Sequence, residues 1–311
     1  MRVKVFIDGS AGTTGLRIAE RLAQREDIRL LTLPEDLRKD AEARSARLNE
    51  ADIAFLCLPD AAAAEAAALT KNPHTVIIDT SMAHRTAPGW VYGMAELPGQ
   101  RERLRAAKRI ANPGCHASGF IALAAPLLRS GLIAADTPLT CFSLTGYSGG
   151  GKKMIAEYEA AARDPLLDAP RQYGIAQGHK HLPEMQAVCG LKIPPVFCPI
   201  VADFYSGMEV TVPLFSGQLR GSARDVAEVY RSAYAGPVIR FAEAADEGGF
   251  LSAAACAGRD DMEISVFGNE ERILLVARFD NLGKGASGAA IQNMNIAMGV
   301  DETTGLVLGK E

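Results

Sequence analysis

Short apolar runs alternate with helix-like segments over the first hundred residues. The runs are VKVFI (3–7), IRLLTL (28–33), DIAFLCL (52–58) and TVIIDTS (75–81). Runs that are apolar on both faces, with helices between them, are typical of parallel strands that are covered on two sides. The pattern therefore predicts an α/β domain with a Rossmann-like, doubly wound parallel sheet.

The pattern changes after residue 115, where longer connections separate the apolar runs. These runs are LTCFSLTG (139–146), EVTVPL (209–214), EISVFG (263–268) and RILLVARF (272–279). The last two are joined by FGNEER like a hairpin. Two amphipathic helices are predicted, GKKMIAEYEAAA (151–162) and SARDVAEVYRSAYAG (222–236). We expect a second, α+β domain with a mixed or antiparallel sheet.

A glycine-rich loop follows the first predicted strand. VFIDGSAGTTGLRIAERLA places Gly9, Gly12 and Gly15 between that strand and a helix. Glycines at such a turn let a pyrophosphate approach, and the helix N-terminus receives the anion. A structural turn is the alternative, but the strand–loop–helix order favours a dinucleotide site that includes Ser10, Thr13 and Thr14.

The residues at the end of the second predicted strand indicate the type of coenzyme. Here LTLPEDLRKD carries Glu35 and Asp36, either of which could bind the ribose hydroxyls of NAD. Arg38 and Lys39 could instead neutralise the 2′-phosphate of NADP, or all four could be solvated charges. We favour NADP as the cofactor.

The C-terminal segment GASGAAIQNMNIAMG (285–299) has the small residues of a helix that packs closely on a cofactor-binding sheet. We therefore expect it to return to the first domain. The predicted domains are 1–114 with 281–311, which binds NADP, and 115–280, which carries catalysis and oligomerisation.

Cys115 stands in ANPGCHASG, after a Pro-Gly turn and before a segment of helical composition. A thiol at a helix N-terminus is favoured as thiolate, and the carboxyl edge of such a sheet is where α/β proteins bind ligands. A buried structural cysteine is the alternative. The boundary position favours a nucleophile.

A cysteine nucleophile needs an acid or base, and the segment GHKHLPEM offers one. Pro183 and Glu184 suit the first turn of a helix, which would place His181 beside a positive dipole end that lowers its pKa. His179 is the close alternative, whereas the adjacent His116 is expected to point away. A zinc site at His-x-His lacks a clear fourth ligand, so no metal is predicted.

Composition and charge exclude several partners. The formal charge is −4, so attraction to nucleic acid or anionic lipid is not expected. The start MRVKVFIDG lacks the apolar region of a signal peptide, and no run approaches membrane-spanning length. The six cysteines are scattered without a CxxC pair and should be free thiols, with Cys57 and Cys141 inert. We expect a cytoplasmic protein.

The glycine loop, the NPGC cysteine and HKHLPE, in this order, resemble the N-acetyl-gamma-glutamyl-phosphate reductase family of arginine biosynthesis, in its shorter form. Family-like segments also occur at 79–97, 144–153, 203–214 and 280–299, so the resemblance covers nearly the whole chain. Aspartate-semialdehyde dehydrogenases are more distantly similar, because their cysteine lies in a different motif and they lack HKHLPE.

The resemblance implies roles for individual residues. Cys115 would be the nucleophile, with His179, His181 and Glu184 as the acid/base cluster and Arg85 and Asn112 as substrate ligands. The cofactor ligands it implies are Gly146, Ser148, Gly149, Asn281, Gly285 and Asn293. Solvated charges remain the alternative for Lys152 and Lys284. The family suggests homodimers or homotetramers.

The implied reaction is covalent. Cys115 attacks a gamma-acyl phosphate, phosphate leaves, and NADPH reduces the thioester with a proton from a histidine, releasing N-acetylglutamate semialdehyde. Backbone N–H groups at the start of the following helix would meet the oxyanion. The alternatives are reduction of an aspartyl or carrier-linked aminoadipyl phosphate, and a non-catalytic NADP-sensing protein.

Overall fold

The computed structural model describes residues 2–243 and 245–309 and divides the chain into two units. Unit 1 comprises the residues up to Pro113 together with Ala286–Leu306. Unit 2 comprises Gly114–Gly285 and the residues from Val307 on. These bounds differ from the expected ones at Gly114, at 281–285 and at 307–309, all of which lie in unit 2.

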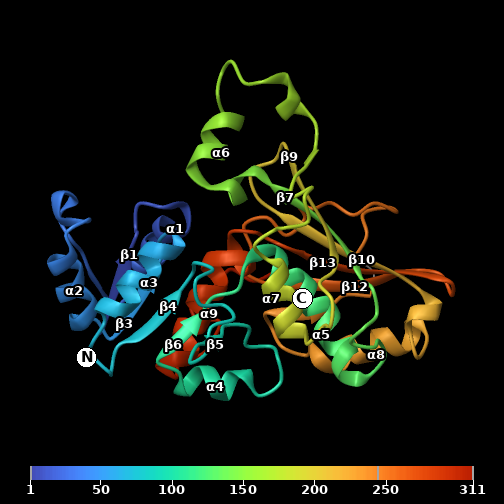
Figure 1. Cartoon of the computed structure of the whole chain (residues 1–311), viewed down its shortest axis with the longest axis horizontal. Helices are drawn as coiled ribbons and strands as arrows, with labels where there is room; N and C mark the ends of the chain where they lie inside the picture. The colour runs from blue at the N-terminus through green and yellow to red at the C-terminus, as the bar shows by residue number, and fades with distance from the viewer. Residues whose placement is uncertain (1, 244, 310–311) are drawn as a thin grey trace. The chain divides into compact units, whose positions relative to one another are not determined.

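Unit 1 is built on a parallel sheet of six strands in the order β2-β1-β3-β4-β6-β5 (Figure 1). The strands are β1 Val3–Asp8, β2 Ile28–Leu31, β3 Ile53–Leu56, β4 Val76–Asp79, β5 Val91–Tyr92 and β6 Arg109–Ala111. All residues of β3 and β4 are buried, because helices cover both faces. The doubly wound sheet predicted from the apolar runs is confirmed.

The helices of unit 1 fall into two layers. They are α1 Thr13–Leu22, α2 Ala41–Glu50, α3 Asp60–Leu69, α4 Gln100–Ala106 and α9 Gly288–Met298. One core cluster holds apolar residues of α1, α4 and α9, and a second holds those of α2 and α3. The small-residue helix α9 thus contributes Ala290, Ile291 and Met294 to the core beneath the sheet of unit 1.

Unit 2 contains a mixed sheet of seven strands in the order β11-β12-β13-β10-β7-β9-β8 (Figure 1). The strands are β7 Thr140–Gly146, β8 Arg171–Gln172, β9 Val196–Ala202, β10 Met208–Phe215, β11 Ile239–Phe241, β12 Met262–Gly268 and β13 Arg272–Phe279. The β12–β13 hairpin and the β10 pairings are antiparallel, whereas β7 pairs with β9 in parallel. The mixed sheet agrees with the expected fold class, although β9 was not predicted.

Helices cover one face of this sheet. The helices of unit 2 are α5 Cys115–Ser130, α6 Gly151–Tyr158, α7 Leu182–Cys189 and α8 Ala223–Ala233. Of these, α5 packs on β10 and β13, and α8 packs on β12. Burial in β10 alternates strictly, as expected for a strand with one covered face. The other face exposes large apolar side chains, namely Phe142, Val196, Phe215 and Leu274.

Candidate functional site

The glycine loop of unit 1 follows β1 and ends at α1, as the sequence predicts. Gly9 has φ +89°, and a Cβ there would lie 2.2 Å from the main-chain oxygen of Cys57. A Cβ on Gly15 would lie 2.4 Å from the main-chain oxygen of Gly9. The N-cap of α1 is Gly12, which has no side chain that could accept a hydrogen bond from the backbone N–H groups of the first turn. This turn includes Thr13 and Thr14. The helix N-terminus is therefore available to an anion.

A cavity of about 490 Å³ lies beside this loop in unit 1. Its lining includes Gly9 and Ser10 from the loop, and Arg38 and Lys39 after β2. Glu35, the alternative ligand for a ribose, has 87% of its side chain exposed and pairs with Arg38 at 3.4 Å. The cavity therefore brings together the loop and the two cations that were expected to bind a 2′-phosphate.

Arg44 is a cation of this cavity that the sequence reasoning missed. It is 7% exposed, and its Nη2 lies 3.0 Å from Oδ2 of Asp8. Burial raises the pKa of Asp8, an effect that the hydrogen bond from Arg44 opposes. The sequence indicates this role only through the position of Arg44 on the side of α2 that faces the core. A buried charge without a partner would be energetically costly, so an arginine there needs an anion beside it.

Three further predicted residues meet inside unit 1. Arg85 donates from Nε to the main-chain oxygen of Asn112 at 3.1 Å. Asn293 donates from Nδ2 to Oδ1 of Asn112 at 3.0 Å and to the main-chain oxygen of Gly93 at 2.9 Å. These two acceptors fix the amide, so Oδ1 of Asn293 is a buried acceptor without a hydrogen-bond partner among residues 2–243 and 245–309. Such an atom fits a ligand donor such as the carboxamide of a nicotinamide.

Cys115 is the first residue of α5, and Gly114 is the N-cap. The sequence expectation of a thiol at a helix N-terminus is thus met in the structure. Cys115 is half-buried. Burial raises the pKa of Cys57, Cys189 and Cys256 to about 12, and it raises the pKa of Cys141 as well. Those four therefore remain neutral thiols, as was expected for Cys57 and Cys141.

Three histidine rings gather in unit 2. The ring centroids of His179 and His181 are 4.9 Å apart, and His116 lies 5.4 Å from His181. His116 is hydrogen bonded at both nitrogens, to Oγ of Ser143 at 2.6 Å and to the hydroxyl of Tyr173 at 2.7 Å. Burial, with the nearby charges of His179 and Lys180, lowers the pKa of His116 to about 3. His116 is therefore a neutral structural residue with no nitrogen left for proton transfer.

His179 and His181 stand just before α7, which begins at Leu182 as the Pro-Glu pair predicts. The backbone N–H of His181 donates to Nδ1 of His179 at 3.2 Å. This bond makes Nδ1 an acceptor, so the ring proton of neutral His179 resides on Nε2. Burial and Lys180 lower the pKa of His179, which favours this neutral form.

Glu184 forms an unexpected hydrogen bond to the residue that precedes the cysteine. Its carboxylate is 2% exposed, and Oε1 accepts the backbone N–H of Gly114 at 2.8 Å. Gly114 directly precedes Cys115, so the carboxylate holds the start of α5. Geometry thus gives Glu184 a positioning contact beside the proposed acid/base cluster.

Tyr173 and Ser143 are site residues that sequence reasoning missed. Tyr173 binds His116, and burial together with the neighbouring Cys115 raises its pKa. Ser143 is completely buried on β7. No local motif marks either residue, because their role depends on which strands lie beside α5.

The remaining predicted cofactor residues lie in unit 2. Nδ2 of Asn281 donates to Oγ of Ser148 at 3.0 Å, and a Cβ on Gly149 would lie 3.5 Å from the same nitrogen. A Cβ on Gly146 would lie 2.6 Å from the main-chain oxygen of Tyr205, so glycine is required there. A Cβ on Gly285 would lie 2.9 Å from Cβ of Cys115. These predicted residues belong to unit 2, whereas those of the glycine loop and Asn293 belong to unit 1.

Two lysines remain among the residues that the sequence singles out. Lys284 is 2% exposed, which corrects the alternative of a solvated charge, whereas Lys152 is exposed, as that alternative expects. In the part of the chain that the structure describes, no group of three His, Cys, Asp or Glu residues is placed to hold a metal ion. Nor is any described helix long and apolar enough to cross a membrane.

Comparison with known proteins gives the family. Residues 4–107 match the family "Semialdehyde dehydrogenase, NAD binding domain", and residues 115–281 match "Semialdehyde dehydrogenase, dimerisation domain". The chain is 47% identical to N-acetyl-gamma-glutamyl-phosphate reductase of Brucella ovis, over 96% of this chain and all of the relative. This chain belongs to the N-acetyl-gamma-glutamyl-phosphate reductase family. N-acetyl-gamma-glutamyl-phosphate reductase 2 of Nostoc sp. is 44% identical over 97% of this chain and 99% of its own.

Solved structures show the same fold at low sequence identity. Aspartate semialdehyde dehydrogenase II of Vibrio cholerae, complexed with ASA, has a TM-score of 0.71 at 17% identity and covers 96% of this chain and 98% of its own. Aspartate semialdehyde dehydrogenase with NADP from Candida albicans has a TM-score of 0.66 at 14% identity, covering 96% and 99%. The chain thus shares its architecture with these dehydrogenases, and its membership of the reductase family makes it an oxidoreductase.

Proposed function

We propose that this protein reduces N-acetyl-L-glutamyl 5-phosphate to N-acetyl-L-glutamate 5-semialdehyde with release of phosphate, in arginine biosynthesis. The observation that carries the proposal is Cys115 at the N-terminus of α5, in a unit that also holds the His179–His181 pair. The relatives at 44–47% identity, which bear the name of this reductase, support the substrate.

In the first step, Sγ of Cys115 attacks the acyl carbon and forms a C–S bond. The bond from that carbon to the phosphate oxygen breaks, and phosphate leaves with the electron pair. The helix N-terminus favours the thiolate that attacks, and its N–H groups stabilise the oxygen charge that develops. Arg85 and Asn112 are the proposed substrate ligands.

Bound NADPH would supply the hydride that reduces the thioester. Gly9, Gly12, Gly15, Ser10, Thr13 and Thr14 would hold the pyrophosphate, and Arg38 and Lys39 would hold the 2′-phosphate. The cationic cavity beside the loop supports NADP over NAD. The buried acceptor of Asn293 supports a nicotinamide ligand on that side chain.

The two cluster histidines receive different roles. Because Nδ1 of His179 already accepts a backbone N–H, its Nε2–H can donate a hydrogen bond to the reacting carbonyl oxygen. His181 is then the proposed acid/base that receives the Cys115 proton and returns it when the C–S bond breaks. Glu184 positions Gly114 and so the start of α5.

Phosphate-dependent NADP reduction by N-acetylglutamate semialdehyde tests the function, because the reverse reaction requires both co-substrates. Cys115→Ser should reduce this rate at least 1,000-fold, about 4 kcal/mol of transition-state stabilisation. Cys198→Ser, at another half-buried cysteine, should retain it. A rate in Cys115→Ser close to that of the native protein would refute covalent catalysis.

The same assay separates the alternatives. Turnover of aspartyl or carrier-linked aminoadipyl semialdehyde at a higher kcat/KM would replace the proposed substrate. NADP binding without turnover of any of the three would indicate a sensing protein instead.

We also propose that the protein assembles as a homodimer or homotetramer in the cytoplasm. The apolar outer face of the unit 2 sheet and the dimerisation-domain family support assembly. No disulfide joins the six cysteines, all of which lie in the described residues, and this supports a reducing compartment.

A further inference from the structure

Asp280 follows β13 and is completely buried in unit 2. Its carboxylate receives three donors from three different segments. Oδ1 accepts the N–H of Leu282 at 2.7 Å, and Oδ2 accepts the N–H of Gly258 at 2.5 Å and the hydroxyl of Ser206 at 3.1 Å. One side chain thus joins the end of β13 to two separate loops.

The main-chain oxygen of Asp280 closes the turn that follows. It accepts the N–H of Gly283 at 3.1 Å and the N–H of Gly285 at 3.0 Å. A Cβ on Gly285 would lie 3.1 Å from this oxygen and 2.9 Å from Cβ of Cys115. Gly285 therefore packs directly against the cysteine and is itself hydrogen bonded to the main chain of Asp280.

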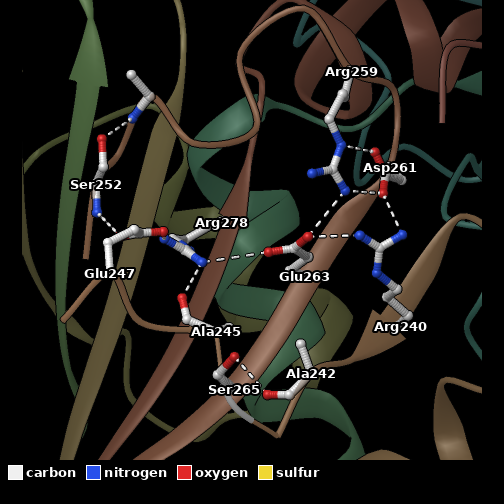
Figure 2. A network of polar contacts seen from close by, with 11 residues as sticks. Arg240, Ala242, Ala245, Glu247, Ser252, Arg259, Asp261, Glu263, Ser265 and Arg278 are labelled. Carbon is white, nitrogen blue, oxygen red and sulfur yellow. Dashed lines mark hydrogen bonds and ion pairs between the residues drawn. The ribbon is translucent and has the colours of Figure 1, made fainter. Parts of the chain in front are cut away.

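The loop that supplies Gly258 is anchored independently of the cysteine. Figure 2 shows Arg278 of β13 paired with Glu247 at 2.5 Å and directed toward Glu263, with a further bond to the main-chain oxygen of Ala245. The N–H of Ser252 donates to Glu247 at 2.9 Å. These bonds hold residues 245–252 to the sheet, in the segment that leads to Gly258.

We propose that Asp280 is a positioning residue for Cys115. Its carboxylate fixes turn 280–285, and the turn presses Gly285 against the base of the Cys115 side chain, which restricts where Sγ can point. The inference rests on the proposed function only in taking Cys115 as the nucleophile. Asp280 opens the family-like segment 280–299, but neither the resemblance nor the reaction chemistry gives it a role.

Asp280→Asn tests the inference with little change in volume. The NH2 group of an asparagine would face groups that now donate to one of the two carboxylate oxygens. Two donors cannot hydrogen bond to each other, so one side of the turn is released. We expect kcat to fall at least tenfold while KM for the acyl substrate changes less than threefold. We also expect N-ethylmaleimide to modify Cys115 at least three times faster, because the released turn uncovers a half-buried thiol.

Mass spectrometry of all six cysteines separates positioning from general loosening. In Asp280→Asn only Cys115 should react faster, whereas Cys141 and Cys256, which are fully buried, should stay protected. Asp261→Asn is the matched control, since Asp261 is equally buried but pairs with Arg240 and Arg259. The control should lower Tm and leave Cys115 reactivity and kcat within twofold. Equal changes in both variants, or faster reaction of every cysteine, would overturn the inference.

A double-mutant cycle tests the route through Gly285. Gly285→Ala places a methyl against Cys115, and we expect kcat to fall by a similar factor. If Asp280 acts through Gly285, kcat of the double variant should be little lower than kcat of the worse single variant. A fall in kcat equal to the product of the two single effects would refute the route. If Asp280→Asn does not fold, Ser206→Ala removes one donor and should raise Cys115 reactivity about twofold, while an unchanged rate would count against the proposal. The alkylation measurements need no substrate, so they remain decisive even if the proposed reduction fails.

Discussion

Glu184 accepts the backbone N–H of Gly114 at 2.8 Å, across 70 positions of sequence. A buried carboxylate on the first turn of α7 thus holds the N-cap of the helix that begins with Cys115. Charge-assisted bonds to backbone N–H groups contribute about 1.5–3 kcal/mol, enough to fix a helix start. The contact connects the histidine segment to the cysteine without any proton transfer.

This contact predicts different results for two substitutions of Glu184. Glu184→Gln keeps an oxygen that can accept from Gly114, so kcat should fall less than about fivefold, or about 1 kcal/mol. Glu184→Ala removes the acceptor and leaves a buried N–H, so kcat should fall at least 30-fold. Steady-state kinetics of the two variants measure the difference. Equal and severe losses in both would instead identify Glu184 as a group that transfers a proton.

His116 predicts how stability depends on pH. Its pKa is about 3 in the folded protein and near 6.5 when exposed, so between these values the unfolded chain binds more protons. Protonation of His116 therefore has no effect on the free energy of unfolding above about pH 6.5. As the pH falls from 6.5 toward 3, protonation of the unfolded chain lowers this free energy progressively. The expected slope is about 1.4 kcal/mol per pH unit.

Urea unfolding of the native protein and of His116→Asn at pH 7, 6 and 5 measures this effect. Asparagine can satisfy polar neighbours but does not titrate, so its free energy of unfolding should fall less steeply on acidification. Parallel pH profiles would show that His116 is not buried in its neutral form.

The cavity of unit 1 predicts the coenzyme preference. Arg38→Ala removes a cation that lines it, so KM for NADPH should rise about tenfold, about 1.4 kcal/mol, and KM for NADH less than twofold. Lys71→Ala, an exposed cation outside this lining, is the control. Equal effects on both coenzymes would remove the argument for a 2′-phosphate site.

The outer face of the unit 2 sheet predicts the interface of the proposed assembly. Phe215 and Leu274 are 67% and 39% exposed there, and a buried aspartate would be costly. Phe215→Asp with Leu274→Asp should shift the molecular mass measured by light scattering toward that of one 33.0 kDa chain. Leu166→Asp is a matched control on a residue that is 70% exposed outside this sheet. If the double variant keeps the native mass, the interface lies elsewhere.

Some parts of the fold were predictable because burial patterns are local. Strands β3 and β4 are apolar at every position and buried on both faces, which predicts parallel strands beneath two helix layers. By contrast, β9 carries Pro199, which weakens a strand prediction because proline cannot donate to the ladder. The structure accommodates Pro199 beside β8, which is only two residues long, where its oxygen accepts the N–H of Tyr173.

The order of residues along the chain was enough to place Cys115 at a helix start, the glycines between a strand and a helix, and Pro183 and Glu184 in a first turn. Each of these depends on neighbours within a few positions, where backbone geometry and helix capping act. Tertiary structure alone decided that Tyr173 and Ser143 occupy both nitrogens of His116, that Glu184 reaches Gly114, and that Asp280 joins three segments. These contacts join residues far apart in sequence. Packing of whole strands and helices brings such residues together, and no local pattern records which side chains will then meet.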